Sequence, residues 1–239
     1  MKKALSAIGH MLSSVHPLVL ALSVLSIVGM NLLANKSIDT GVPWLALDCG
    51  ILLSWLAFLS MDVATHCYGP RTATVVSLVS LGLNLVMVGI FFVASVVPGV
   101  WGESFVDGSE AVINTALDHT FGGTWFVILG SSIAYAVSAV VNNFLNWGIG
   151  ERVGGRGTFG TFALRSYVST FIAQFTDNMV FALIVSRTFF GWTLLQCVTC
   201  AVTGAVLELL FEVFFSPIGY RISRRLLHRA DVGGVQVMG

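Results

Sequence analysis

Long apolar runs dominate the chain, and short polar stretches separate them. Runs of about 20 residues, the length that an α-helix needs to cross a bilayer, occur at residues 17–35, 43–61, 72–97, 121–146, 162–187 and 190–215. No connection between them is long enough to form an extramembrane domain. The pattern therefore predicts an all-α, polytopic membrane protein, a bundle of six transmembrane helices that makes one integral membrane domain over residues 1–239.

The composition agrees with a membrane protein. Hydrophobic residues make up 56% of the 239 residues and charged residues only 10%, whereas soluble domains carry about 25% charged residues. The formal net charge is zero and no long basic run occurs, so the chain lacks the electrostatic footprint of a nucleic-acid-binding protein. The cysteines lie mostly in or beside apolar runs, where a thiol behaves as a small hydrophobic group rather than as part of a disulfide framework.

Charged residues in the connections predict the orientation. Lys and Arg gather at the N-terminus, in the second and fourth connections and in the tail, whereas the connection 98–120 has acidic residues and no Lys or Arg. Because basic loops favour the cytoplasm, we predict that both termini are cytoplasmic. The first run is too long for a signal peptide and has no cleavage site, so it is read as a retained helix. Pro217 is expected to end the last helix, before a short basic interfacial tail.

The fifth run contains polar residues at helical spacing. Steps of 4, 4, 3 and 1 residues place five side chains on one face, namely Ser166, Thr170, Gln174, Asp177 and Asn178. Since lipid leaves polar groups unsatisfied, this face should point into the bundle or a cavity. A central Asp costs roughly 2.5–3.5 kcal/mol on insertion scales. No Lys or Arg is expected deep in a span, so Asp177 is predicted to be protonated or to bind a ligand. Arg165 is expected to reach the cytoplasmic interface or to complete the stripe.

Three other runs carry polar residues as well. The fourth has Ser131, Tyr135, Ser138 and Asn142 at steps of 4, 3 and 4, with Asn143 adjoining. The second has Asp48 and Asp62 on one face. The sixth has Glu208 and Glu212 one turn apart, where they could face the bundle or the membrane interface. The bundle is therefore predicted to have polar inner walls.

The residue types around Asp177 indicate two kinds of chemistry. A carboxylate accepts from two adjacent donors, and the carboxamides of Gln174 and Asn178 both donate and accept. With an aromatic ring such as Tyr135, Phe171, Phe175 or Phe181 for stacking, this set suits a flat heterocycle with an amide-like edge. The same carboxylate could instead carry a proton.

Three motifs occur in a characteristic order. They are 59-LSMDVATHCYGPRTA-73, 165-RSYVSTFIAQFTDNMVF-181 and 216-SPIGYRI-222. Together with six spans, they resemble the queuosine precursor transporter family, also described as putative vitamin uptake transporters, over residues 43–222. The resemblance implies uptake of a 7-deazaguanine, such as the 7-cyano or 7-aminomethyl form, across a bacterial inner membrane.

Individual positions match the family pattern. The matching residues are Asp62, Tyr68, Gly69, Arg165, Ser166, Gln174, Asp177, Pro217 and Tyr220. The chain departs from the pattern at His66, where an acid is expected, and at Asn178, which replaces Ser or Thr. His66 could pair with Asp62 one turn away, and the exact substrate, a cationic one in particular, stays open. The predicted substrate-binding residues are Asp177, Gln174, Asn178, Arg165, Asn142, Asn143, Tyr135, Phe181, Asp62 and Glu208.

Other classes of protein fit less well. The chain has no G-x-x-x-x-G-K-[ST] loop, no H-E-x-x-H and no G-x-S-x-G, so we predict no ATP binding, no enzymatic activity, no metal and no cofactor. A channel would need a ring of charges. The main alternative is a substrate-binding subunit of an energy-coupling-factor importer for a vitamin-like heterocycle, although the first helix lacks a clean A-x-x-x-A. The expected partners are the lipid bilayer and a small heterocycle, and a homodimer stays open.

Overall fold

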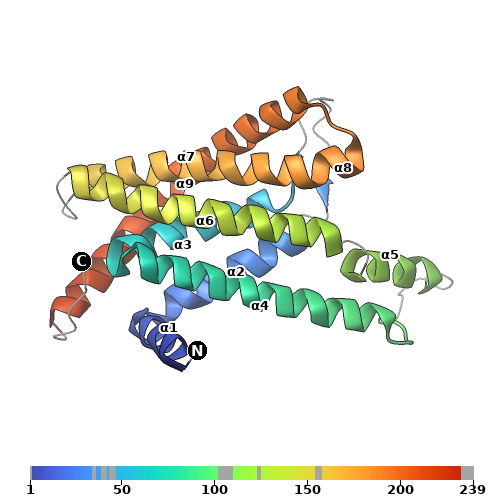
Figure 1. Ribbon diagram of the computed structural model, residues 1–239, viewed down its shortest axis with the longest axis horizontal. Helices are drawn as coiled ribbons and strands as arrows, with labels where there is room; N and C mark the ends of the chain where they lie inside the picture. Colours follow the sequence, from blue (N-terminus) through green and yellow to red (C-terminus); the bar gives the residue numbers. More distant parts are fainter. Residues whose placement is uncertain are drawn as a thin grey trace.

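The computed structural model describes residues 2–33, 36–38, 42, 47–101, 110–122, 125–153 and 158–232. Its elements are α1 (Lys2–Ser14), α2 (Pro17–Leu33), β1 (Ser37–Ile38), β2 (Leu47–Asp48), α3 (Ile51–Tyr68), α4 (Pro70–Val96), α5 (Glu110–Gly122), α6 (Trp125–Val153), α7 (Phe159–Phe181), the π-helical turn η1 (Ala182–Ser186), α8 (Arg187–Phe190) and α9 (Leu194–Val232). The long helices form a bundle, as Figure 1 shows.

The bundle has the dimensions and surface of a membrane protein. Five helices in the described part of the chain are long and apolar enough to cross a bilayer, and the number is six if α1 and α2, which meet at a 104° bend, form one span. On α4, Val86, Ile90 and Val93 are each more than half exposed. Such apolar surface is covered by lipid in a bilayer but would stay in contact with water in a soluble monomer. The predicted all-α, polytopic membrane fold is confirmed.

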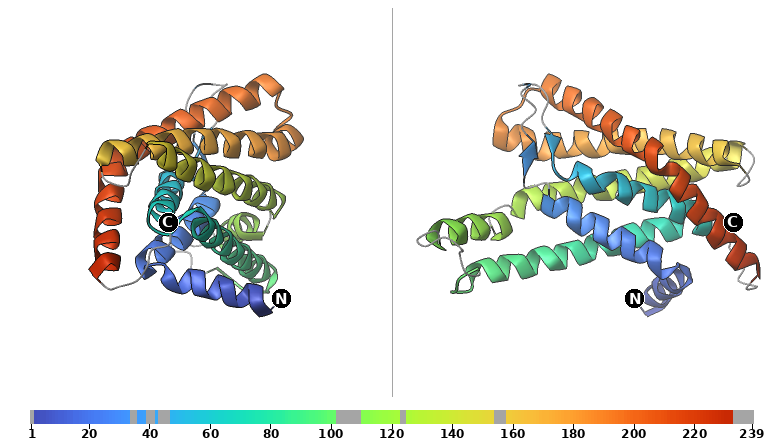
Figure 2. Two further views of the ribbon diagram at one scale, coloured as in Figure 1. Left: turned by 60° about the vertical axis from the view of Figure 1, so that its left-hand side comes forward. Right: turned by 180° about the vertical axis from the view of Figure 1, so that it is seen from behind.

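Helix α3 occupies the centre of the bundle. It packs against α2, α4, α6, α7 and α9, and its inward side chains, such as Phe58 and Met61, are almost fully buried. Helix α7 lies between α6 and α9, with extensive packing on both sides. Figure 2 shows α9 crossing the bundle obliquely. The polar faces of α3, α6, α7 and α9 therefore converge on one interior.

The two ends of the bundle differ. Helices α5 and α8 lie at one end together with the short antiparallel strand pair, in which Ser37 faces Asp48 and Ile38 faces Leu47. We call this the strand end. Helix α1 and the C-terminal part of α9 lie at the opposite end (Figures 1 and 2). Helix α5, which belongs to the connection predicted to be external, thus lies at the strand end.

Two predicted spans have the wrong bounds. The second helix is Ile51–Tyr68 rather than 43–61, because β2 takes up part of the apolar run before it. The last helix continues through Pro217 to Val232 instead of ending near residue 215. A proline removes the N–H that would bond to the carbonyl four residues earlier. Here the Ser216 hydroxyl donates to the Val213 carbonyl at 3.1 Å, so that carbonyl keeps a hydrogen-bond donor although the backbone bond is absent, and the helix continues.

The remaining bounds differ less. The first, third and fifth predicted spans agree with α2, α4 and α7–η1 to within a few residues, and α6 runs to Val153, beyond the predicted end at 146. Helix α1 was not predicted, because its apolar positions lie on one face only and never form a long run. The basic tail continues α9 as far as Val232, and the last part of that prediction, residues 233–239, lies outside the described residues.

Candidate functional site

A pocket lies between α2, α3, α6, α7 and α9. Its empty space is about 510 Å³, counting the open space at its mouth. The lining residues are Met30, Asn31, Gly50, Ile51, Ser54, Phe58, Ser131, Gln174, Asp177, Asn178, Phe181 and Glu208. We call it the polar pocket. It is close to the strand end, because α2 and α7 end beside it and α3 begins there.

The polar face of α7 leads into this pocket. Ser166 and Thr170 are completely buried and Gln174 is 1% exposed, while Asp177 and Asn178 are half-buried. On the opposite face, Leu164 and Ile172 are exposed where lipid would lie. The prediction that this stripe points into the bundle is confirmed. The sequence alone could predict this face, because steps of three and four residues keep side chains on one side of any α-helix.

Two carboxylates reach the pocket from different helices. Asp177 of α7 accepts a hydrogen bond from the Ser138 hydroxyl at 2.8 Å. Glu208 of α9 accepts one from the Ser54 hydroxyl at 2.6 Å. Both carboxylates line the pocket, and a carboxylate oxygen accepts hydrogen bonds through two lone pairs. The pocket can therefore offer acceptors to a ligand that carries N–H donors.

Two amide groups of the pocket contribute donors. The Nε2 atom of Gln174 and the Nδ2 atom of Asn178 are buried and have no hydrogen-bond partner within the described ranges. A buried donor that lacks an acceptor costs about 1–3 kcal/mol. A ligand with a carbonyl oxygen would satisfy these donors and remove that cost.

A glycine allows α9 to approach Asn178. A Cβ atom built at Gly204 would lie 2.7 Å from Asn178 Nδ2 and 3.2 Å from its Cγ, which is closer than van der Waals contact permits. The absence of a side chain at Gly204 thus lets the amide lie against the backbone of α9. The geometry at the floor of the pocket depends on this contact.

Further from the strand end, a second group of polar side chains is fully buried. Asp62 of α3 accepts from Asn142 Nδ2 at 2.7 Å and from the Thr170 hydroxyl at 3.3 Å. The Ser166 hydroxyl contacts both Asp62 and Glu212 within hydrogen-bonding distance. Helices α3, α6, α7 and α9 each contribute to this group. We call it the inner cluster, and it includes Arg165 and His66, described next.

Arg165 lies inside the bundle. Only 4% of its surface is exposed, so the prediction that it reaches the interface is wrong and the alternative, that it completes the polar stripe, holds. Its Nε atom donates to Asn146 Oδ1 at 2.9 Å, and a terminal nitrogen lies 3.0 Å from His66 Nδ1. Because a guanidinium only donates, His66 Nδ1 is the acceptor and His66 is the neutral tautomer with its hydrogen on Nε2. Gly150 makes room, since a Cβ there would lie 2.6 Å from the guanidinium carbon.

The ten predicted site residues fall into three groups. Gln174, Asp177, Asn178, Phe181 and Glu208 line the polar pocket. Asp62, Asn142 and Arg165 belong to the inner cluster instead. Asn143 and Tyr135 belong to neither.

The structure gives Tyr135 and Asn143 different surroundings from those predicted. Tyr135 is buried edge-on against Phe58, its hydroxyl near Met61 Sδ, so Phe58 and not Tyr135 faces the pocket. Asn143 bonds to Thr65 and Thr74. Glu208 is 7% exposed and lines the polar pocket, so it faces the bundle.

Several residues of the two groups were not predicted. On α3, Ser54 and Phe58 of the pocket stand four and eight residues before Asp62, and His66 follows four residues after it. This spacing puts all four on one face of the helix, so it could have identified Ser54 and Phe58. Glu212 was recognised as polar but left out of the site. Its burial depends on how α9 crosses α7, which the local pattern does not contain.

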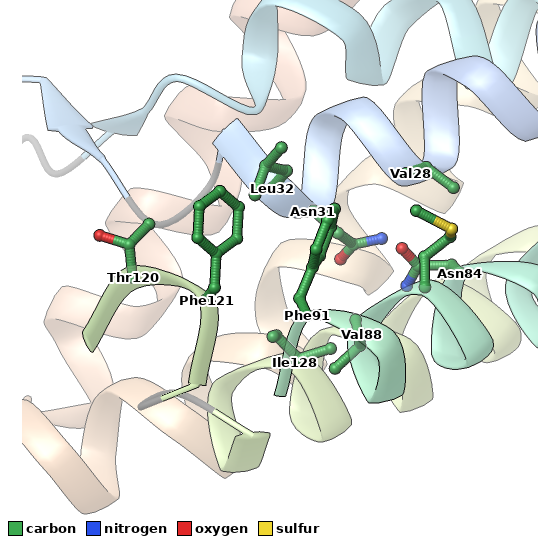
Figure 3. Close-up of a pocket in the computed structure, with 10 residues that line it drawn as sticks. Val28, Asn31, Leu32, Asn84, Val88, Phe91, Thr120, Phe121 and Ile128 are labelled. Atoms are coloured by element: carbon green, nitrogen blue, oxygen red, sulfur yellow. The ribbon is translucent and has the colours of Figure 1, made fainter. Parts of the chain in front are cut away.

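A second, more apolar pocket adjoins the first. It has about 330 Å³ of empty space, and Figure 3 shows its lining. Helices α2, α4, α5 and α6 supply the residues Val28, Asn31, Leu32, Asn84, Met87, Val88, Phe91, Thr120, Phe121 and Ile128. Asn31 lines both pockets, which are therefore neighbours. Its polar side chains are two amides and one hydroxyl, and it has no carboxylate. It therefore suits a polar ligand less well than the polar pocket, which has two carboxylates.

The described residues contain no group of three or more His, Cys, Asp and Glu side chains placed to hold a metal ion. No disulfide bond joins the four cysteines, all of which lie in the described part of the chain. Cys197 is buried with its sulfur 3.8 Å from the Ala182 carbonyl, as expected for a small packed side chain.

The fold and the pocket together define a multi-pass membrane protein with a polar binding pocket inside its helix bundle. The family model described as putative vitamin uptake transporter matches residues 48–222. The chain belongs to this family, which is also the queuosine precursor transporter family. No curated protein and no solved structure matches the chain.

Proposed function

We propose that this protein imports a 7-deazaguanine, such as the 7-cyano or 7-aminomethyl form, across a bacterial inner membrane, and that the polar pocket binds it. One observation carries the proposal. A single pocket presents two carboxylates, Asp177 and Glu208, beside two buried amide donors, Gln174 and Asn178. Membership in a transporter family supports a role in transport for the ligand of this pocket.

The edge of a 7-deazaguanine complements this set. It presents a ring N–H and an exocyclic amine side by side, next to a carbonyl oxygen. Asp177 can accept from the two adjacent donors, while Gln174 or Asn178 donates to the carbonyl. Phe58 and Phe181, which line the same pocket, supply apolar and aromatic surface for the ring. Every polar group on this edge of the base then has a partner.

The position of the pocket suits uptake. The distribution of Lys and Arg predicts that the connection containing α5 is external, and α5 lies at the strand end. The polar pocket is close to that end. In this orientation, the pocket is nearer to the outer side, from which an importer takes its substrate.

Uptake is proposed to be driven by the proton gradient. The chain has no phosphate-binding loop, which leaves an ion gradient or metabolic trapping of the substrate as the energy source, and the proposal is the gradient. Initial uptake is expected to change with external pH and to collapse when an uncoupler is added. The measurement is short-time uptake of labelled 7-cyano-7-deazaguanine into cells that express the protein. Indifference to both treatments would exclude proton coupling.

Ligand-induced stabilisation tests the substrate class. A ligand that binds only the folded state stabilises it by about 2.7 kcal/mol at a concentration 100 times its Kd. The melting temperature of the purified protein is therefore expected to rise with 7-cyano- or 7-aminomethyl-7-deazaguanine and much less with adenine. If a folded, monodisperse preparation shows no shift with any of these bases, the substrate assignment is wrong.

Substitution of Gly204 by Ala is expected to weaken ligand binding about tenfold, which corresponds to about 1.4 kcal/mol. The added methyl group meets Asn178 Nδ2 at 2.7 Å, and the amide has to rotate away from its position on the pocket floor. The melting temperature without ligand should change little, because a side-chain rotation relieves the contact.

Gly82→Ala on α4 is the matched control for this substitution. No atom lies within 4 Å of a Cβ built at Gly82, so ligand binding should stay at the wild-type level. Wild-type affinity in Gly204→Ala would show that the Asn178 amide takes no part in binding.

A further inference from the structure

The contacts of Ser166 require an additional proton in the inner cluster. Its single hydroxyl oxygen lies within hydrogen-bonding distance of both Asp62 Oδ2 and Glu212 Oε1. A hydroxyl group has only one hydrogen to donate. The second contact can therefore be a hydrogen bond only if one of the two carboxyl groups carries a proton. We call Asp62, Ser166 and Glu212 the carboxyl trio.

The surroundings of the two carboxyl groups favour Glu212 over Asp62 as the protonated group. Asp62 accepts from Asn142, Thr170 and Ser166, and three donors suit an ionised group. Glu212 is completely buried, and its Oε2 atom has no hydrogen-bond partner in the part of the chain that the structure describes. An ionised carboxylate in such a place would be poorly compensated. The proton therefore belongs on Glu212 Oε1, which donates to Ser166, while Ser166 donates to Asp62.

The charges around the trio balance when it holds one proton. Arg165 of α7 attracts Asp62, and His66 of α3 is neutral because its Nδ1 atom accepts from Arg165. From α9, Glu208 lies one turn from Glu212 at the polar pocket. The α6 side chains in hydrogen-bonding contact with the inner cluster are the amides Asn142 and Asn146. With one proton, Asp62 and Arg165 cancel; without it, a buried negative charge is left uncompensated.

The trio is connected mechanically to the polar pocket. Glu212 and Glu208 occupy successive turns of α9, and Thr170 and Gln174 occupy successive turns of α7. Residues four apart are neighbours on a helix surface. A shift of α9 against α7 thus changes the trio and the pocket together. All three members of the trio are fully buried, so proton exchange with water requires such a change.

We propose that the carboxyl trio is the proton-binding site that couples import to the proton gradient, which leaves Asp177 to bind the substrate. On the outer side a proton from water forms the O–H bond at Glu212 Oε1. On the inner side that bond breaks, its electron pair stays on Oε1, and the proton leaves to water. This inference rests on the proposed function, because the coupled solute is taken to be a 7-deazaguanine.

Transport by the purified protein in liposomes tests the proposal. Labelled 7-cyano-7-deazaguanine is measured in two assays: exchange across the membrane without a gradient, and accumulation driven by an imposed pH gradient. Glu212→Gln keeps the shape of the protonated acid and cannot release a proton. It is expected to retain exchange and to lose accumulation. Glu151→Gln, at an exposed carboxylate of α6, is the control and should retain both.

Two outcomes in liposomes overturn the proposal. One is accumulation by Glu212→Gln at the wild-type level. The other is accumulation by the wild type that follows a sodium gradient instead of the pH gradient. If Glu212→Gln does not fold, Ser166→Ala removes the bridging hydroxyl without changing charge. It is expected to shift the pH of half-maximal accumulation, and an unchanged pH profile also overturns the proposal.

Infrared spectroscopy separates this inference from the proposed function. The C=O stretching band of a protonated carboxylic acid is expected in the wild type and in Glu151→Gln, and it should lose intensity in Glu212→Gln. This measurement needs no substrate. If the wild type does not exchange 7-deazaguanines but the band behaves as expected, the proposed substrate fails while the proton assignment holds. If the band does not depend on Glu212, the trio holds no proton and the inference is wrong.

Discussion

Asp177→Asn is expected to abolish the binding and uptake of 7-deazaguanines while the protein stays folded in the membrane. The change keeps the shape of the side chain and its contact with Ser138. It removes the negative charge and places an NH₂ group near the N–H donors of the base. Hydrogen bonds to a charged group contribute about 1.5–3 kcal/mol each. The loss of two corresponds to at least a 100-fold lower affinity.

The measurement combines the ligand-induced shift in melting temperature with initial uptake in cells. Ser138→Ala is the matched control, because it leaves the carboxylate and removes only one neutral donor. Its affinity should fall about fivefold, as expected for a hydrogen bond of about 1 kcal/mol. If Asp177→Asn binds and imports the base like the wild type, Asp177 is not the carboxylate that recognises it. Glu208, on the opposite helix of the pocket, would then be the group to test.

The second large effect is expected for Arg165→Met. The guanidinium is buried, donates to Asn146 and His66, and attracts Asp62. Without it, the negative charge of the carboxyl trio has no counter-ion in the inner cluster. The substitution also removes the hydrogen bonds to Asn146 and His66, and a buried charge that loses its compensation is costly. The melting temperature of Arg165→Met in detergent should therefore fall strongly.

A double-mutant cycle checks the cause of this loss. Asp62→Asn in the Arg165→Met background removes both charges, so the double variant is expected to be more stable than Arg165→Met alone. Arg152→Met, at an exposed position of α6, is the control and should leave the melting temperature unchanged. If Arg165→Met melts like the wild type, the guanidinium is not the counter-ion of the trio. If the two substitutions simply add, Arg165 acts independently of Asp62.

The sequence predicted correctly those features that depend on residues close together in the chain, such as helix faces and most membrane spans. The inward face of α7 follows from the spacing between Ser166 and Asn178, because the geometry of an α-helix is the same in every bundle. The apolar runs follow from the thickness of the bilayer. The end of the last helix was wrong because Pro217 was read without Ser216, whose hydroxyl bonds to the carbonyl that the proline leaves. That error was local too, because the hydroxyl and the carbonyl belong to the same turn of the helix.

By itself, the sequence determined the class of protein, the family and the residues of α7 that face the interior, because length, hydropathy and periodicity act along one helix at a time. Only the tertiary structure decided which side chains from different helices meet. It divided the predicted site into the polar pocket and the inner cluster, brought Glu208 to the same pocket as Asp177, and joined Glu212 to Asp62 through Ser166 and Arg165 to His66. The physical reason is that these contacts depend on how α3, α6, α7 and α9 cross, and the crossing of helices is set by packing between surfaces far apart in the chain.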